Sequence, residues 1–237
     1  MKLNTLEIRN YLLKPHMLEH FIDYFEEHFI ASQAAVNMKV LGQFRLVGEP
    51  QHFVWLRGFD DMQARLQGLE GFYYGEFWQK HRNTTNSMIL DNDDVHLLRP
   101  IGDVDLTAGL SAESVAAELA AGTISAETGV VAIDFYQARA GERDALVSAF
   151  QTQVLPIYQQ EGIQFRGAFV AEMSENDFPR LPVIQNENEL IVITAYASEE
   201  AYHEQRAKVS ARVHEAVGAA ETLLLQPTLR SAIRYLV

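Results

Sequence analysis

One order of strand-like and helix-like segments occurs twice in this chain, and it constrains the fold more than any other feature of the sequence. Polar and apolar residues alternate with a period of two where we predict strands, and recur every three to four residues where we predict helices. The first-half segments are 4–13, 16–34, 40–47, 52–59, 60–78 (with a break near Gly68–Gly71) and 95–100. The second-half segments are 130–136, 142–160 (with a kink at Pro156), 165–172, 190–196, 198–216 and 223–226.

The two halves also correspond in residue spacing. Tyr136 follows Tyr11 by 125 residues, and Gly167 follows Gly42 by the same interval. The order β-α-β-β-α-β is typical of ferredoxin-like units. We therefore predict an α+β fold built from two tandem ferredoxin-like units. The predicted domains are 1–101 and 129–237, joined by a linker with a short helix at 102–128.

A long connection at 173–188 separates two predicted strands of the second half. Connections of this length in compact domains are usually functional or mobile. Its apolar residues include Phe178, Leu181, Val183 and Ile184, which suit it to contact another surface. We predict that it reaches a neighbouring copy and that the protein is at least a homodimer.

Charge and composition exclude several classes of function. The chain has 19 Lys and Arg against 32 Asp and Glu, a net charge of −13, which disfavours binding to nucleic acid or to an anionic membrane. It contains no Cys, so disulfides, zinc–thiolate sites and cysteine nucleophiles are absent. No apolar run approaches the ~20 residues that span a bilayer, and the first residues do not resemble a signal peptide. We expect a cytoplasmic protein.

Three segments of the first half resemble the NIPSNAP family. The segment LEIRNYLLKP at 6–15 is similar to the opening E-x-R-x-Y-x-L-K-P signature of the family, and HFVWLRGFDD at 52–61 and VHLLRP at 95–100 resemble later strands. The second half matches more loosely, because Ala132 and Asp134 replace the Glu and Arg of the signature.

This resemblance implies a dimeric α+β barrel, in which two ferredoxin-like sheets face each other and helices cover their outer faces. With two units in one chain, the barrel could close within one chain or between two chains. The resemblance does not imply a particular biochemical activity for this chain. Relatives of the same barrel fold include cofactor-free monooxygenases, haem-dependent enzymes and plain ligand binders, and fold alone does not choose among them.

Two sets of residues alternate on the first and third predicted strands. We predict that the apolar set, Leu6, Ile8, Val54 and Leu56, faces the helices. The other set then faces the barrel cavity as a pocket for an aromatic or carboxylated ligand, or as a buried structural ion-pair network. This second set is Glu7, Arg9, Tyr11, Trp55 and Arg57.

The segment at 73–82 is densely aromatic and supplies further candidates. We predict that Tyr74 and Trp78 contribute to ligand binding. His81 is the candidate catalytic general base, because an ordinary imidazole titrates near neutral pH. The alternative is an aromatic helix face that covers the sheet, with His81 at its solvent edge.

Histidine pairs offer weaker signals. His16 and His20 have a spacing that metal sites use, and His203 and His214 lie on one helix face where either could ligate haem. Neither pair has a supporting carboxylate spacing or an attachment motif, so we predict no metal and no cofactor. The motifs of serine hydrolases, P-loop proteins and dinucleotide-binding proteins are absent.

Two functions fit these observations. The first is a binding or interaction protein that holds a small apolar or aromatic molecule in the barrel cavity. The alternative is a cofactor-independent oxygenase, isomerase or lyase acting on a phenolic or polyketide-like substrate. The two differ in one requirement, since the enzyme needs a histidine or a carboxylate within reach of the ligand.

Overall fold

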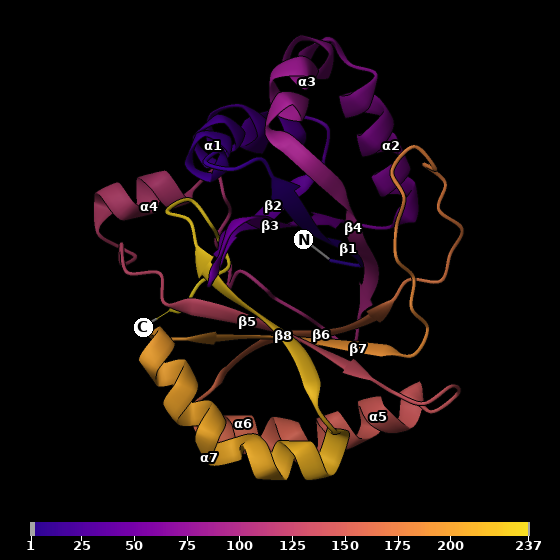
Figure 1. Cartoon of the computed structure of the whole chain (residues 1–237), viewed down its shortest axis with the longest axis vertical. Helices are drawn as coiled ribbons and strands as arrows, with labels where there is room; N and C mark the ends of the chain where they lie inside the picture. Colours follow the sequence, from indigo (N-terminus) through magenta and orange to yellow (C-terminus); the bar gives the residue numbers. More distant parts are fainter. Residues whose placement is uncertain (1–2, 237) are drawn as a thin grey trace.

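The computed structural model describes residues 3–236, and its helices and strands follow the predicted order (Figure 1). The first half contains β1 (Thr5–Leu13), α1 (Leu18–Ala34), β2 (Lys39–Leu46), β3 (Glu49–Phe59), α2 (Met62–Tyr73), α3 (Glu76–Met88) and β4 (Ile89–Pro100). The linker carries α4 (Val115–Ala121). The second half contains β5 (Val130–Gln137), α5 (Arg143–Ala149), η1 (Phe150–Val154), α6 (Leu155–Gln160), β6 (Gln164–Ala171), β7 (Glu189–Tyr196), α7 (Glu199–Val217) and β8 (Ala220–Pro227).

The eight strands form one closed antiparallel barrel in the order β1-β3-β2-β8-β5-β7-β6-β4. Each half contributes four neighbouring strands, ordered β4-β1-β3-β2 in the first half and β6-β7-β5-β8 in the second. Two short seams, β2 with β8 and β4 with β6, join the halves. The barrel therefore closes within a single chain, which settles an alternative that the sequence left open.

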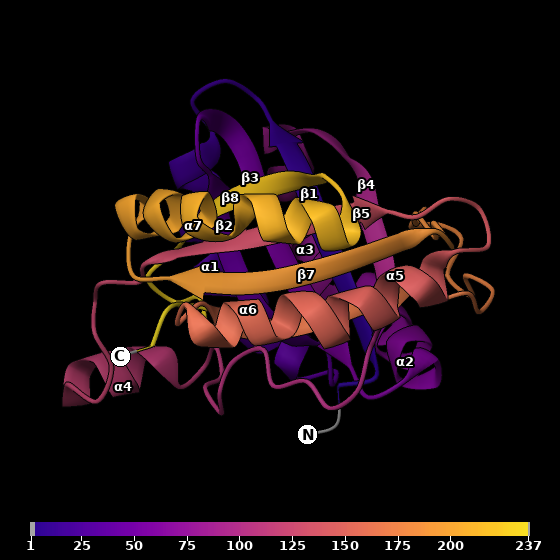
Figure 2. The same ribbon diagram turned by 90° about the horizontal axis from the view of Figure 1, so that it is seen from below.

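The helices cover the barrel from two sides. In Figure 1, α1, α2 and α3 lie on the side of the first-half strands, and α5, α6 and α7 lie on the opposite side. Figure 2, seen from below, shows α7 beside the α5–α6 segment across the second-half strands. The sequence predicts a kink at Pro156, and a π-helical turn, η1, ends two residues before this proline.

The barrel interior is apolar and filled, and the predicted orientation of the first-half strands is wrong. Leu6, Ile8, Val54 and Leu56 point into the barrel and pack against second-half residues such as Ile133. The opposite set, represented by Tyr11 and Trp55, packs under α1 and α2. An eight-stranded barrel has an interior that side chains just fill, so it favours the apolar set. The polar set predicted to line the barrel cavity therefore lies outside the barrel, on the helix side of the sheet.

The expected helix break near Gly68–Gly71 does not occur, because α2 runs without interruption to Tyr73. Gly68 is needed for close packing instead, since a Cβ there would lie 2.6 Å from Cγ of Met38. The break falls at Tyr74–Gly75, between α2 and α3. In the linker, α4 forms with Val115 buried. No helix within residues 3–236 has both the length and the apolar character to cross a membrane.

Candidate functional site

A buried ion-pair network lies between the first-half strands and their helices. Glu7 of β1 is its centre and is fully buried. One carboxylate oxygen of Glu7 accepts hydrogen bonds from Arg57 Nη2 at 2.6 Å and from Arg9 Nη1 at 2.8 Å. The other oxygen accepts from Arg65 Nε of α2 at 2.7 Å. The pairing Glu7↔Arg57 across β1 and β3 places the first two charges on one face of the sheet.

The charges of this network do not balance. Burial by itself would raise the pKa of Glu7, but Arg57, Arg9 and Arg65 outweigh burial and hold the pKa well below its ordinary value. Glu7 is therefore a fixed anion and not a base. Three guanidinium groups surround one buried carboxylate, and the second carboxylate near Arg65, Asp177, is partly exposed. The network thus keeps an excess of positive charge.

A cavity of about 370 Å³ lies above this network, on the helix side of the sheet. Its lining comes from β1, β3, α1, α2, α3, the start of β4 and the loop after β6. The lining side chains are Tyr11, Phe21, Phe25, Phe29, Gln33, Trp55, Phe72, Tyr73, Trp78, Gln79, Arg82, Thr85, Asn86, Ile89, Asn92, Phe178, Arg180 and Leu181.

Two lining residues connect the cavity to the network below. Arg9 Nε donates a hydrogen bond to Tyr11 Oη at 3.2 Å. Trp55 lies against two guanidinium groups, with the Cζ atoms of Arg9 and Arg57 at 5.5 and 5.1 Å from its ring centroid. Trp55 is 2% exposed, and its Nε1 has no hydrogen-bond partner within the described chain. The floor of the cavity therefore combines aromatic surface with an unused donor.

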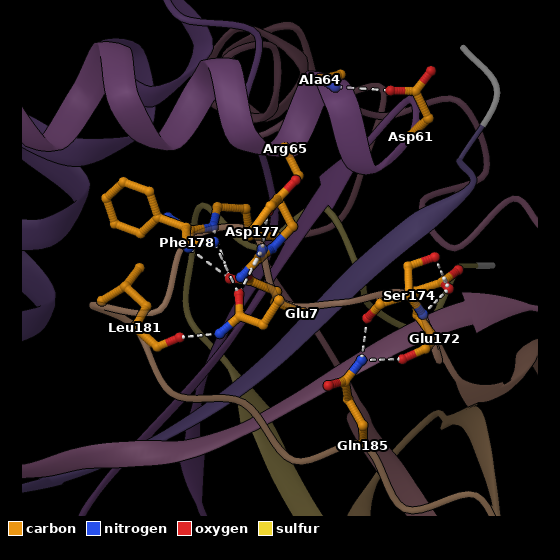
Figure 3. A network of polar contacts seen from close by, with 12 residues as sticks. Glu7, Asp61, Ala64, Arg65, Glu172, Ser174, Asp177, Phe178, Leu181 and Gln185 are labelled. Atoms are coloured by element: carbon orange, nitrogen blue, oxygen red, sulfur yellow. Dashed lines mark hydrogen bonds and ion pairs between the residues drawn. The ribbon is translucent and has the colours of Figure 1, made fainter.

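The long loop of the second half closes one side of this first-half cavity. Figure 3 shows Arg65 reaching Glu7 on one side and the loop on the other. Arg65 Nη1 lies 3.1 Å from Asn176 Oδ1 and 3.2 Å from Asp177 Oδ1. The ring of Phe178 then packs 5.8 Å from that of Tyr73, centroid to centroid. The loop is thus docked on its own chain, so its predicted contact with a second copy loses support and the homodimer stays a prediction.

The sequence candidates separate into three groups. Tyr11, Trp55 and Trp78 line the cavity, and Glu7, Arg9 and Arg57 form the network beneath it. Tyr74 is wrong as a lining residue, because its side chain is 57% exposed and lies outside the cavity lining. The polar set thus contains a buried ion-pair network, and two of its members, Tyr11 and Trp55, line the cavity beside that network, while ligand binding there stays a prediction.

His81 is not placed to act on a ligand in this cavity. It is buried, but it lies outside the lining, its ring stacks on Phe77 at 4.4 Å, and its Nδ1 lies 2.6 Å from Tyr24 Oη. Burial, with the neighbouring charges of His28 and Lys80, lowers the pKa of His81. The alternative placed His81 at the solvent edge of an aromatic helix face, but His81 is buried. The segment at 73–82 both packs around His81 and supplies Tyr73 and Trp78 to the cavity lining.

Several site residues escaped the sequence analysis. Arg65 and Tyr73 lie on α2, and Phe178 and Arg180 on the loop, far from the strand motifs in sequence. The aromatic Tyr73 and the apolar residues of the loop were visible signals, but nothing in the sequence paired the loop with α2.

The histidine pairs noted in the sequence lie on the surface. His16, His20, His203 and His214 are all exposed. Within residues 3–236, no three His, Asp or Glu side chains gather closely enough to hold a metal ion. His96 instead bridges β4 and β7: its Nδ1 lies 3.0 Å from Glu189 and its Nε2 3.5 Å from Asp94.

Fold and site together define an eight-stranded α+β barrel protein with an aromatic cavity on the outer face of its first half. Residues 6–103 match the model of the NIPSNAP family. The first half of the chain is therefore a NIPSNAP domain, as the segment at 6–15 predicted. None of the functionally curated proteins matches this sequence.

Solved structures share the whole barrel at low sequence identity. A provisionally assigned monooxygenase from Lactobacillus acidophilus is 12% identical, with all of both chains covered and a TM-score of 0.61. A second provisionally assigned monooxygenase, from Fusobacterium nucleatum, is 10% identical over 95% of this chain and 93% of its own, with a TM-score of 0.58. An anthrone oxidase-like protein is 12% identical over 95% and 91%, with a TM-score of 0.53. These similarities show the fold.

Proposed function

We propose that the protein binds a small aromatic molecule in the cavity between β1, β3 and helices α1–α3. The observation that carries this proposal is the composition of the cavity wall. Nine of the lining side chains are Phe, Tyr or Trp and a further two are Leu or Ile, and they come from β1, β3, β4, all three helices and the loop. A cavity of about 370 Å³ is within the usual range for small-molecule sites, which are mostly apolar with a few placed polar groups.

The loop supports this proposal because it supplies one wall. Phe178 and Leu181 line the cavity, and the segment that carries them is fixed by Arg65 and by a hydrogen bond from Asn176 Nδ2 to the carbonyl of Leu181 at 2.9 Å. A wall held by an ion-paired arginine excludes water from the aromatic surface, and this strengthens the burial of an apolar ligand.

The alternative is a cofactor-independent oxygenase, isomerase or lyase. The names of the barrel neighbours refer to oxygenase chemistry, but a shared fold at this level of identity does not transfer a reaction. The described lining of the cavity contains no histidine and no carboxylate. Glu7 below it is held as an anion by three arginines. A binding role is therefore favoured over one that needs a general base.

Intrinsic fluorescence tests the proposal directly. The chain has two tryptophans, Trp55 and Trp78, and both line the cavity. A saturable change in tryptophan emission on titration with bicyclic aromatic compounds is expected, with stoichiometry of one per chain checked by calorimetry.

A matched pair of variants on α3 localises the binding. Asn86 and Asn83 are both exposed, but only Asn86 lines the cavity. Asn86→Phe fills the cavity and should abolish the response, whereas Asn83→Phe adds the same ring outside it and should leave the response unchanged. Equal behaviour of the two variants, or an absence of saturable binding by the unmodified chain, would show that the cavity is not a ligand site.

A further inference from the structure

The charge around the cavity is opposite in sign to that of the chain. The whole sequence carries a net charge of −13. The described cavity lining nevertheless includes Arg82 and Arg180 and no Asp or Glu. The network beneath it adds three guanidinium groups against the single buried carboxylate of Glu7. A positively charged recess in an acidic protein attracts an anion and repels a cation.

Three donors on the cavity wall can receive such an anion. Trp55 Nε1 is buried without a partner, and a buried unpaired donor is costly unless a ligand satisfies it. Tyr11 Oη already accepts from Arg9 Nε, which leaves its own hydrogen free to be donated. Burial raises the pKa of Tyr73, so its hydroxyl keeps its proton, and this phenol senses the charges of Arg57 and Arg9 in the same network.

The arrangement of these donors favours a ligand that carries an anionic oxygen group at one end of an aromatic ring system. The rings of Tyr11 and Trp55 meet edge to face, with centroids 5.9 Å apart. The guanidinium groups of Arg9 and Arg57 lie against Trp55. A carboxylate has two oxygens and about four lone-pair positions, enough for three such donors. Hydrogen bonds to an ionised acceptor are also the stronger kind.

We infer that the ligand is an aromatic carboxylate, whose carboxylate accepts hydrogen bonds from Trp55, Tyr11 and Tyr73 while its rings lie among the phenylalanines of α1. This inference rests on the proposed function and adds the chemical class of the ligand. The aromatic walls alone would also suit an organic cation through cation–π contacts. The arginines beneath and beside the cavity exclude that choice.

A pair of probes of equal shape tests the charge. 2-Naphthoate is an anion at neutral pH, and 2-naphthamide is its neutral counterpart. Naphthoate should bind at least about tenfold more tightly, which is the effect of one hydrogen bond to a charged group. The difference should shrink as salt is raised, to the extent that the outer arginines contribute.

Conservative variants test the donors. Trp55→Phe and Tyr73→Phe each remove one donor and keep an aromatic ring, and Trp78 still reports binding in the first. Each should weaken naphthoate about tenfold and naphthamide less than threefold. Tyr136→Phe, a buried tyrosine of β5 in the other half, is the control and should change neither affinity.

The outcomes separate the two proposals. Equal affinity for naphthoate and naphthamide, or equal loss of both in the donor variants, overturns the carboxylate inference and leaves aromatic binding intact. Tighter binding of a cationic naphthylamine derivative also overturns it. If no aromatic compound binds while circular dichroism shows the fold intact, the proposed function fails and the inference fails with it.

Discussion

Replacement of Glu7 by Gln should destabilise the fold more than any other change of one charge in the first half. The side chain is fully buried, and three guanidinium groups donate to its carboxylate at 2.6 to 2.8 Å. Gln keeps the shape and one acceptor but removes the negative charge. Three buried cations then lack their central counter-charge. Breaking a buried pair from one side costs about 3–5 kcal/mol, so we expect a loss of about 4 kcal/mol.

Urea unfolding at pH 7 measures this loss. For a chain of this size, about 4 kcal/mol corresponds to a shift of the midpoint by roughly 1.5 M. Glu19→Gln is the matched control, because Glu19 pairs with Arg45 at the surface and its side chain is 65% exposed. Surface pairs are worth about 0–1 kcal/mol, so this control should unfold close to the unmodified protein.

The pH dependence gives a second readout with a defined sign. Because the pKa of Glu7 is lowered in the folded state, its contribution is present above the ordinary value of 4.5 and is lost as the pH falls below it. The stability gap between the unmodified protein and Glu7→Gln should thus be constant from pH 7 to about 5 and narrow on further acidification. A gap below 1 kcal/mol at pH 7, or one that widens in acid, would refute the reasoning about the network.

Three other predictions concern separate parts of the chain. Burial lowers the pKa of His96, but the hydrogen bonds and charges of Asp94 and Glu189 outweigh burial and raise this pKa to about 9. Protonated His96 therefore contributes its full stabilisation below the ordinary value of 6.5, and this contribution is lost as the pH rises through 9. His96→Gln should remove that alkaline loss, seen in urea midpoints at pH 7 and 10. Arg65→Met should release the loop at 173–188, seen as faster cleavage there by limited proteolysis while the rest of the chain stays resistant. The homodimer predicted from the sequence should appear in light scattering as twice 26.8 kDa, and a monomer mass would contradict it.

Element order was predictable because it depends on local periodicity. The alternation around Leu6 and Ile8, and the helical spacing from Leu18 to Phe29, survive in β1 and α1 with ends shifted by a few residues. The family could be identified from the same segments. Such patterns predict the order of helices and strands because the periodicity of each segment shows which of its residues share a face.

Orientation of the strands could not be predicted in the same way. Both faces of β1 are buried, one by the other half of the barrel and one by helices, so alternation distinguishes two faces without saying which is inside. The assumption that apolar residues face helices failed because the barrel interior is the more completely dry environment. Arginines suit the helix side, where their long stems pack among rings and their charged ends meet Glu7.

The cavity required tertiary information throughout. Arg65 pairs with Glu7 across 58 positions of the sequence and with Asp177 across 112. No local pattern links residues that distant, and the loop is an insertion that has no counterpart in the first half. The sequence motifs predicted Trp55 and Trp78 as ligand-binding residues. They did not predict the loop residues Phe178, Arg180 and Leu181 that line the same cavity.

The cavity wall contains residues from both halves of the chain, so any function of the cavity belongs to the whole chain and not to the first half alone. The family match ends at residue 103, while Phe178, Arg180 and Leu181 come from the other half. The residues that match the family model therefore do not include all of the cavity wall, and a change in the loop of the second half would alter the cavity without altering the matched domain. In this protein, a loop of the second half covers one side of the cavity that the first half forms.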